Sequence, residues 1–140
     1  MIIPPPDAIV SLQSLDNRKW VCAEGEGNLP LVANRQEPQT WELFRWIDMS
    51  STFGQHSVSL LAQANGKYVC AENGGLSPLI ANRDTPKSWE TFTWISHSDG
   101  NISLRSIANG TQIGVDAVTD HLVANQSRLG VIIKFAIKIW

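Results

Sequence analysis

Three features of the amino-acid sequence predict an all-β fold. A segment of about 38 residues recurs, short apolar runs are separated by Gly, Asn or Pro, and no stretch shows a helical period. With 140 residues, 43% of them hydrophobic, the chain is long enough for one core and too short for two ordinary domains. We therefore expect a single all-β domain built from repeats.

The repeat is clearest when the sequence is compared with itself at a shift of 48 residues. Residues 10–47 and 58–95 then match without a gap, and about 21 of the 38 positions are identical. A third, more divergent copy spans residues 102–139, where ISLRSIANGTQIGVD matches VSLLAQANGKYVCAE. Each copy offers about four strand-like runs. Twelve short strands in three pseudo-symmetric repeats predict a β-trefoil, which is a closed fold.

The chain begins MIIPPPD, and its three consecutive prolines can join neither a helix nor a central strand. We expect residues 1–8 to form an extended leader or linker and residues 9–140 to form the trefoil domain. The start has neither the basic nor the apolar region of a signal peptide. Two localisations stay open: the cytoplasm, or a module cut from a secreted protein.

Charge and hydropathy exclude two classes of partner. The net charge is -2 and the pI is about 5.8, so the chain lacks the clustered Lys and Arg that nucleic acids or anionic membranes require. No apolar run approaches the roughly 18 residues that span a bilayer. We expect neither nucleic-acid binding nor membrane insertion, and the sequence does not indicate an oligomeric state.

Alternation along the fourth strand of each repeat predicts which face is buried. In the third repeat Phe135 and its alternate neighbours are apolar, while Lys134 and Lys138 lie on the other face. Transferred to the first two repeats, this pattern predicts an inward set: Glu42, Phe44, Trp46, Glu90, Phe92 and Trp94. The same pattern turns Trp41 and Trp89 outward. In the second strand it turns four more residues outward: Trp20, Glu24, Tyr68 and Glu72.

An outward ring beside carboxylates, an amide and a guanidinium is the chemistry of sugar binding. The C–H face of a pyranose is apolar enough to lie on an indole, and its hydroxyls need short, oriented donors and acceptors. We predict two carbohydrate sites. The first comprises Trp41, Glu42, Glu24, Asn34, Arg35 and Trp20, and the second comprises Trp89, Glu90, Glu72, Asn82, Arg83 and Tyr68.

Some of these residues have an alternative, structural interpretation. Glu42 and Glu90 face inward, where a carboxylate can accept backbone N–H groups instead of a ligand. Asn34 and Asn82 keep a counterpart, Asn125, in the repeat that has lost its ring, which also fits a role in a turn. Both interpretations stay open at this point.

The third repeat has lost the predicted site. Ile132 and Ile133 stand where the second repeat has Trp89 and Glu90, and the guanidinium and phenol positions are occupied by Gln126 and Gln112. The sequence therefore predicts two sites and not three.

Catalytic and metal sites find little support in the sequence. A glycosidase needs two carboxylates that flank a cleft. Glu24 and Glu42 could form such a pair, but duplicated sites on a small symmetric scaffold suit binding better. His56, His97 and His121 occupy unequal repeat positions and have no metal-ligand spacing. We expect a non-enzymatic protein without a cofactor or a metal. Cys22 and Cys70 are repeat-equivalent, so we expect them to lie too far apart for a disulfide.

The segment KYVCAENGGLSPLIANR, followed by P-x-x-W-E-x-F, resembles the sequences of fascin-like β-trefoils. Among these it is most similar to the sugar-binding modules of carbohydrate-binding module family 92. The resemblance covers nearly the whole chain after the leader and implies a lectin or carbohydrate-binding module for polysaccharides such as β-glucans, or for glycan termini. The alternative is a fascin-like protein-interaction module, in which the outward Trp residues would anchor a protein partner.

Overall fold

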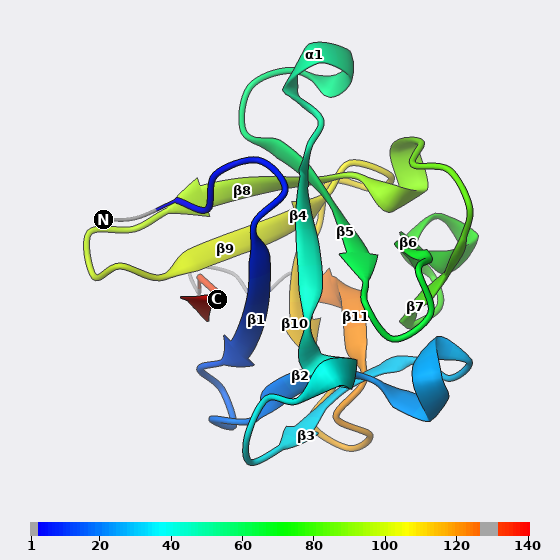
Figure 1. Ribbon diagram of the computed structural model, residues 1–140, viewed down its shortest axis with the longest axis vertical. Coiled ribbons are helices and arrows are strands. Elements are labelled where there is room, and N and C mark those ends of the chain that lie inside the picture. The colour runs from blue at the N-terminus through cyan, green and yellow to red at the C-terminus, as the bar shows by residue number, and fades with distance from the viewer. Residues whose placement is uncertain (1–2, 127–131) are drawn as a thin grey trace.

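The structure is a computed structural model that describes residues 3–126 and 132–140 (Figure 1). The first repeat contributes β1 (Ile9–Ser14), β2 (Trp20–Ala23), β3 (Leu31–Arg35) and β4 (Phe44–Asp48), and the second contributes β5 (Ser57–Ala62), β6 (Tyr68–Ala71), β7 (Leu79–Arg83) and β8 (Phe92–Ser96). The third contributes β9 (Ile102–Ser106), β10 (Gln112–Val115), β11 (Leu122–Gln126) and β12 (Phe135–Ile139). A single-turn helix, α1 (Ser50–Phe53), connects β4 to β5. The predicted twelve strands are confirmed.

Six of these strands close into a barrel. The pairs run β1 to β4, β4 to β5, β5 to β8, β8 to β9, β9 to β12 and β12 back to β1, all antiparallel. Closure removes the free sheet edges that an open sheet of this size would expose. The two ends of the chain lie beside each other because β1 pairs with β12 along its length, from Val10 with Ile139 to Ser14 with Phe135.

The other six strands form three hairpins that cover one end of the barrel: β2 with β3, β6 with β7 and β10 with β11. The core has the threefold pattern that the repeat predicts. Phe44, Phe92 and Phe135 occupy equivalent positions and are fully buried. Around them lie leucines from all three repeats: Leu12, Leu60, Leu104, Leu31, Leu79 and Leu122.

The fourth strand of the first two repeats is shorter than the sequence predicts. It begins at Phe44 and Phe92, while Glu42 and Glu90 belong to the 3-10 turns η2 (Thr40–Glu42) and η4 (Ser88–Glu90). Each glutamate accepts the backbone N–H of the residue three positions before it, which closes the turn. Both residues are nonetheless inward, as predicted, and only 3% exposed.

The second strand also ends earlier than its sequence pattern predicts. Glu24 and Glu72 are not strand residues but open the 3-10 turns η1 (Glu24–Gly27) and η3 (Glu72–Gly75). The residues that follow them have left-handed backbone angles, for example φ 61° at Gly25 and φ 56° at Asn73. An extended strand cannot continue through such a conformation.

Trp46 and Trp94 were both expected in the core, and only Trp46 is buried, at 3% exposure. Trp94 is half-buried: one side packs against the core, and its ring stacks on the imidazole of His56 with centroids 4.3 Å apart. Its neighbour Trp46 lies 6.4 Å away and tilted.

Residues 3–8 lie along β4. The backbone of Asp7 donates to the Trp46 carbonyl at 2.8 Å, the backbone of Trp46 donates to the Ala8 carbonyl at 2.8 Å, and the Arg45 side chain donates to the Asp7 carbonyl at 3.0 Å. Pro4 is buried. The described part of the proline-rich segment is therefore docked on the barrel (Figure 1).

Candidate functional site

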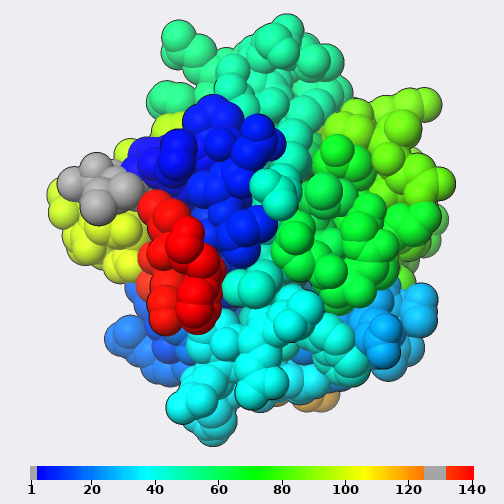
Figure 2. All heavy atoms as spheres, viewed as in Figure 1, coloured from blue at the N-terminus to red at the C-terminus, as the bar shows by residue number. Residues whose placement is uncertain are grey.

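Two surface hollows lie at repeat-equivalent places, where the chain passes from the third to the fourth strand of its repeat. The first hollow has a volume of about 610 Å³ and the second about 350 Å³. In Figure 2 the segments that line the two hollows occupy separate parts of the surface. The segment of the first repeat (cyan) lies at the bottom, and that of the second repeat (yellow-green) lies at the upper right. The first hollow is lined by Arg35, Gln36, Glu37, Gln39, Thr40, Trp41 and Glu42. The second hollow is lined by Arg83, Thr85, Lys87, Ser88, Trp89 and Glu90.

A buried carboxylate lies on the inner side of each hollow. Glu42 accepts the backbone N–H of Gln39 at 2.6 Å, and Glu90 accepts that of Lys87 at 2.7 Å. Each glutamate also accepts the thiol hydrogen of a cysteine in its own repeat, Glu42 that of Cys22 and Glu90 that of Cys70. Burial, together with this carboxylate, raises the pKa of both cysteine thiols to about 12. The structural role that the sequence left open for these glutamates is therefore present in the fold.

An ion pair holds the guanidinium of the first hollow. Arg35 Nη2 lies 2.8 Å from Glu24 Oε1, and Nη1 donates to Asn34 Oδ1 at 2.7 Å. Glu24 and Asn34 do not line the hollow, so they act through Arg35, whose remaining N–H donors are available to a ligand. The guanidinium holds the pKa of the Glu24 carboxyl below its usual range.

The same arrangement recurs in the second repeat with two further contacts. Arg83 reaches both carboxylate oxygens of Glu72, at 2.7 and 3.3 Å, and donates to Asn82 Oδ1 at 3.0 Å. Asn82 itself donates to Glu72 Oε2 at 2.8 Å. The amide of Asn82 and the guanidinium of Arg83 together lower the pKa of the Glu72 carboxyl. Such a closed network fixes the guanidinium before any ligand arrives, which lowers the entropic cost of binding.

The two indole rings are outward, as the alternation predicts, but to different degrees. Trp89 is 38% exposed, whereas Trp41 is half-buried. The loop of η3 supports the Trp89 ring, because a β-carbon at Gly74 would lie 3.8 Å from its Nε1. Each hollow thus combines an accessible ring with a fixed guanidinium and hydroxyl or amide groups, which are the elements that a sugar needs.

Comparison with solved structures identifies the architecture. The designed threefold symmetric protein ThreeFoil superposes with a TM-score of 0.78 at 16% identity, covering 94% of this chain and 98% of that one. The apo BEL β-trefoil superposes with the same TM-score at 13% identity, covering 99% and 97%. The chain has a β-trefoil fold. No protein-family model and no curated protein matches the sequence.

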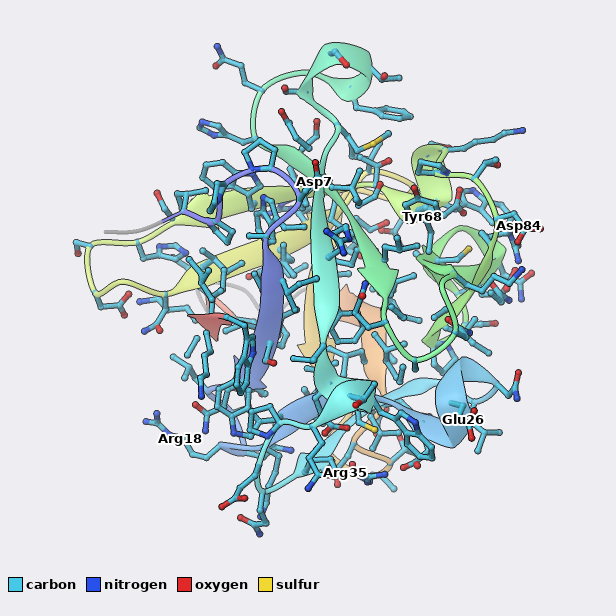
Figure 3. The ribbon with its side chains drawn as sticks, in the orientation of Figure 1. Asp7, Arg18, Glu26, Arg35, Tyr68 and Asp84 are labelled. Carbon is cyan, nitrogen blue, oxygen red and sulfur yellow. The ribbon has the colours of Figure 1, made fainter. Side chains whose placement is uncertain are left out.

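Trp20 and Tyr68, which the sequence assigned to the two sites, do not line either hollow of the trefoil. Each is the cross-strand partner of the arginine of its own repeat, Trp20 of Arg35 and Tyr68 of Arg83, at a point where the pairing register shifts. Both rings are half-buried. Figure 3 labels residues of the first and second repeats. Arg35 lies at the bottom and Glu26 at the lower right, whereas Tyr68 and Asp84 lie on the right.

The third trefoil repeat presents different groups at the equivalent place. Ile132 is 58% exposed where the other repeats have their Trp, and Gln112 accepts the backbone N–H of Ile133 at 2.9 Å. Asp116, at the position of Glu72, accepts the backbone N–H groups of Val118 and Thr119, and these lower the pKa of its carboxyl. The side chains of residues 125 and 126 lie outside what the structure describes.

Several lining residues of the trefoil hollows were not singled out from the sequence. They come from the segments QEPQT and DTPKS, which differ between the repeats while the flanking ANR and WE are identical. The signal that could have found these residues is that a variable segment lies between two segments that are identical in both repeats. The residues missed in this way are Gln36, Glu37, Gln39 and Thr40, with Thr85, Lys87 and Ser88.

The described residues of the trefoil offer neither a metal site nor a membrane-spanning helix. These residues contain no group of three or more His, Cys, Asp or Glu side chains that could hold a metal ion. The imidazole of His97 hydrogen-bonds to Ser103 at 2.7 Å, and Cys22 and Cys70 are buried, free thiols. Within the same residues, no helix has the length and apolar character needed to cross a membrane.

Proposed function

We propose that this protein binds carbohydrate without catalysis, through the two hollows of its first and second repeats. The observation that carries the proposal is the duplicated set of an indole and an arginine held by Glu and Asn. It recurs at the same place in two repeats, although the third repeat forms its four strands without it. The sequence resemblance to carbohydrate-binding module family 92 supports the same function, with β-glucan-type polysaccharides as the first ligands to test.

The chemistry of the carboxylates supports binding rather than hydrolysis. A glycosidase needs one carboxylic acid that stays protonated near neutral pH, which requires a raised pKa. The pKa values of the Glu24 and Glu72 carboxyls are lowered instead, by the arginine and amide groups that they contact. Glu42 and Glu90 already accept hydrogen bonds from the backbone and from a thiol.

A glycan array followed by titration calorimetry tests the proposal. Substituting both Trp41 and Trp89 with Ala should abolish binding to the polysaccharide that the array identifies, because each stacked ring contributes on the order of 1 kcal/mol beyond its burial. Ile132→Ala is the matched control, since Ile132 occupies the equivalent exposed position in the third repeat and should leave binding unchanged. Trp140→Ala controls for the loss of an exposed Trp elsewhere on the surface.

The same experiment separates this function from its alternative. If the folded protein binds no glycan on the array, and the Trp variants lose a protein partner instead, then the hollows are protein-interaction sites and the proposal is wrong.

A further inference from the structure

The two hollows differ in charge at positions that the repeat makes equivalent. Where the first hollow has Glu37 and Gln39, the second has Thr85 and Lys87. The charged groups that line the first hollow are one guanidinium and two carboxylates, a net charge of -1. Those that line the second are a guanidinium, an ammonium and one carboxylate, a net charge of +1. The hollows therefore differ by two charges.

A third difference lies beside the ring. Gly74 supports the indole of Trp89, with its would-be β-carbon 3.8 Å away. The equivalent residue of the first repeat is Glu26, an exposed carboxylate in η1 that shares the left-handed conformation of this turn at φ 57°. The first repeat thus carries an additional negative charge at the position where the second repeat has the uncharged Gly74 against its ring.

Neighbouring charges that do not line the hollows offset one another. Asp84 forms an ion pair with Lys67, whereas the first repeat has Lys19 and the uncharged Gln36 at these positions, so Lys19 offsets the charge of Glu26. Among the residues that the structure describes, no carboxylate pairs with the Lys87 ammonium, and no cation pairs with Glu37 or Glu26. These three side chains are exposed and can respond to a ligand.

We propose that the two sites select different sugars: the second hollow takes a sugar that carries a carboxylate or sulfate, and the first takes a neutral one. The inference rests on the proposed carbohydrate-binding function and specifies the ligand class of each site. Lys87, beside the fixed guanidinium of Arg83, is the residue that selects the anion. Glu37 repels an anion from the first hollow, which it lines.

Exposed charge pairs are weak individually, so the selectivity comes from several together. Contacts of this kind change affinity by a factor of a few each, and with the differences at positions 37/85 and 39/87 we expect about a tenfold difference in anion preference between the sites at low salt. The Debye length falls from about 30 Å at 0.01 M salt to about 3 Å at 1 M, so most of this preference should disappear at high salt.

Methyl β-glucoside and methyl β-glucuronide are suitable probes, because they differ only in a neutral or anionic group at C6. The same pair in the galacto series extends the test to the epimeric sugar. The Trp indole N–H resonances in a nitrogen-15 correlation spectrum report each site separately, once Trp41→Ala and Trp89→Ala assign the two signals. The ratio of glucuronide to glucoside affinity is then measured for each site in the full chain at about 0.01 and 1 M salt.

Exchanging the equivalent residues provides the matched variants. Lys87→Gln should lower the glucuronide preference of the second site several-fold and leave the first site unchanged. Glu37→Thr with Gln39→Lys should raise the preference of the first site several-fold toward that of the second. All three positions are exposed, and a thermal melt of each variant checks that the fold is retained.

The outcomes distinguish the inference from the function on which it rests. Different affinity ratios at the two sites, moved by the exchanges and reduced by salt, support the inference. Equal ratios at both sites, or ratios that the exchanges do not move, overturn it while carbohydrate binding stands. If neither a glycoside nor any polysaccharide binds the folded protein, the proposed function fails and the inference falls with it.

Discussion

The side chain of Asn65 lies where a β-carbon on Gly27 would have to be. The predicted position of that carbon is 2.1 Å from Asn65 Nδ2, far inside any allowed contact. Asn65 cannot move away easily, because its amide donates to the Ala81 carbonyl at 2.8 Å and its oxygen accepts the Lys67 N–H at 3.0 Å. Gly27 belongs to the first repeat and Asn65 to the second, so this contact joins two copies of the repeat.

We therefore expect Gly27→Ala to destabilise the fold by about 3 kcal/mol, because a clash adds to the cost of an L-residue at φ 89°. Gly66→Ala is the control: Gly66 also has a positive φ, 69°, but nothing lies within 4 Å of its added carbon, so about 1 kcal/mol is expected. Urea unfolding measures both values. Equal costs for the two variants would show that Asn65 yields.

Glu42→Ala should destabilise the protein by about 2 kcal/mol, because the part-buried N–H of Gln39 and the buried thiol of Cys22 lose their acceptor. Glu37→Ala, in the same hollow but exposed, should change stability by less than about 0.5 kcal/mol. Thermal or urea unfolding tests the pair. A small effect at Glu42 would mean that water replaces its carboxylate.

Both cysteines should be inert in the native protein. A pKa of about 12 leaves roughly one thiol in ten thousand ionised at pH 8, and both side chains are buried. A thiol reagent at pH 8 should label neither cysteine in the folded protein and both after unfolding in guanidinium. Rapid labelling without denaturant would contradict the burial of these residues.

The ion pairs of the two sites predict a weak dependence of stability on acid pH. The pKa values of the Glu24 and Glu72 carboxyls are lowered in the fold, so the pairs contribute fully above the unfolded value near 4.5. The contribution is lost as the pH falls below 4.5 and through the folded values. With side chains a quarter to a third exposed, each pair is expected to contribute about 0.5 kcal/mol. Changing both glutamates to Gln should remove this part of the pH dependence of unfolding.

Titration with a short neutral or anionic oligosaccharide should give about two sites per chain at saturation. Trp41→Ala or Trp89→Ala alone should reduce this value to about one. Two sites on one rigid barrel can hold two distant points of a polymer, so avidity is expected for a polysaccharide and not for a monosaccharide. A value near three would mean that the third repeat binds without an aromatic ring.

Much of this arrangement could be predicted from the sequence alone. Alternation predicted that Phe44 and Phe92 are inside and that Trp41 and Trp89 are outside, because the side chains of a strand alternate between faces. It began the strand two residues too early, because β4 starts at Phe44, while Trp41 and Glu42 belong to the 3-10 turn η2, which the buried carboxylate closes. It also overestimated the burial of Trp94, whose ring is half-buried and stacks on the imidazole of His56 instead of lying inside the core.

The sequence by itself determined the threefold repeat, the closed all-β fold and the absence of the Trp and Arg from the third repeat, since each follows from comparing positions along one chain. Only the tertiary structure decided which side chains converge. Glu24 and Asn34 hold Arg35 and do not line the hollow, while Glu37, Gln39 and Lys87 do line one. The contact of Gly27 with Asn65 likewise exists only when the first and second repeats pack together. The physical reason is that these contacts join different strands and turns, and the distances between them exist only once the barrel has closed.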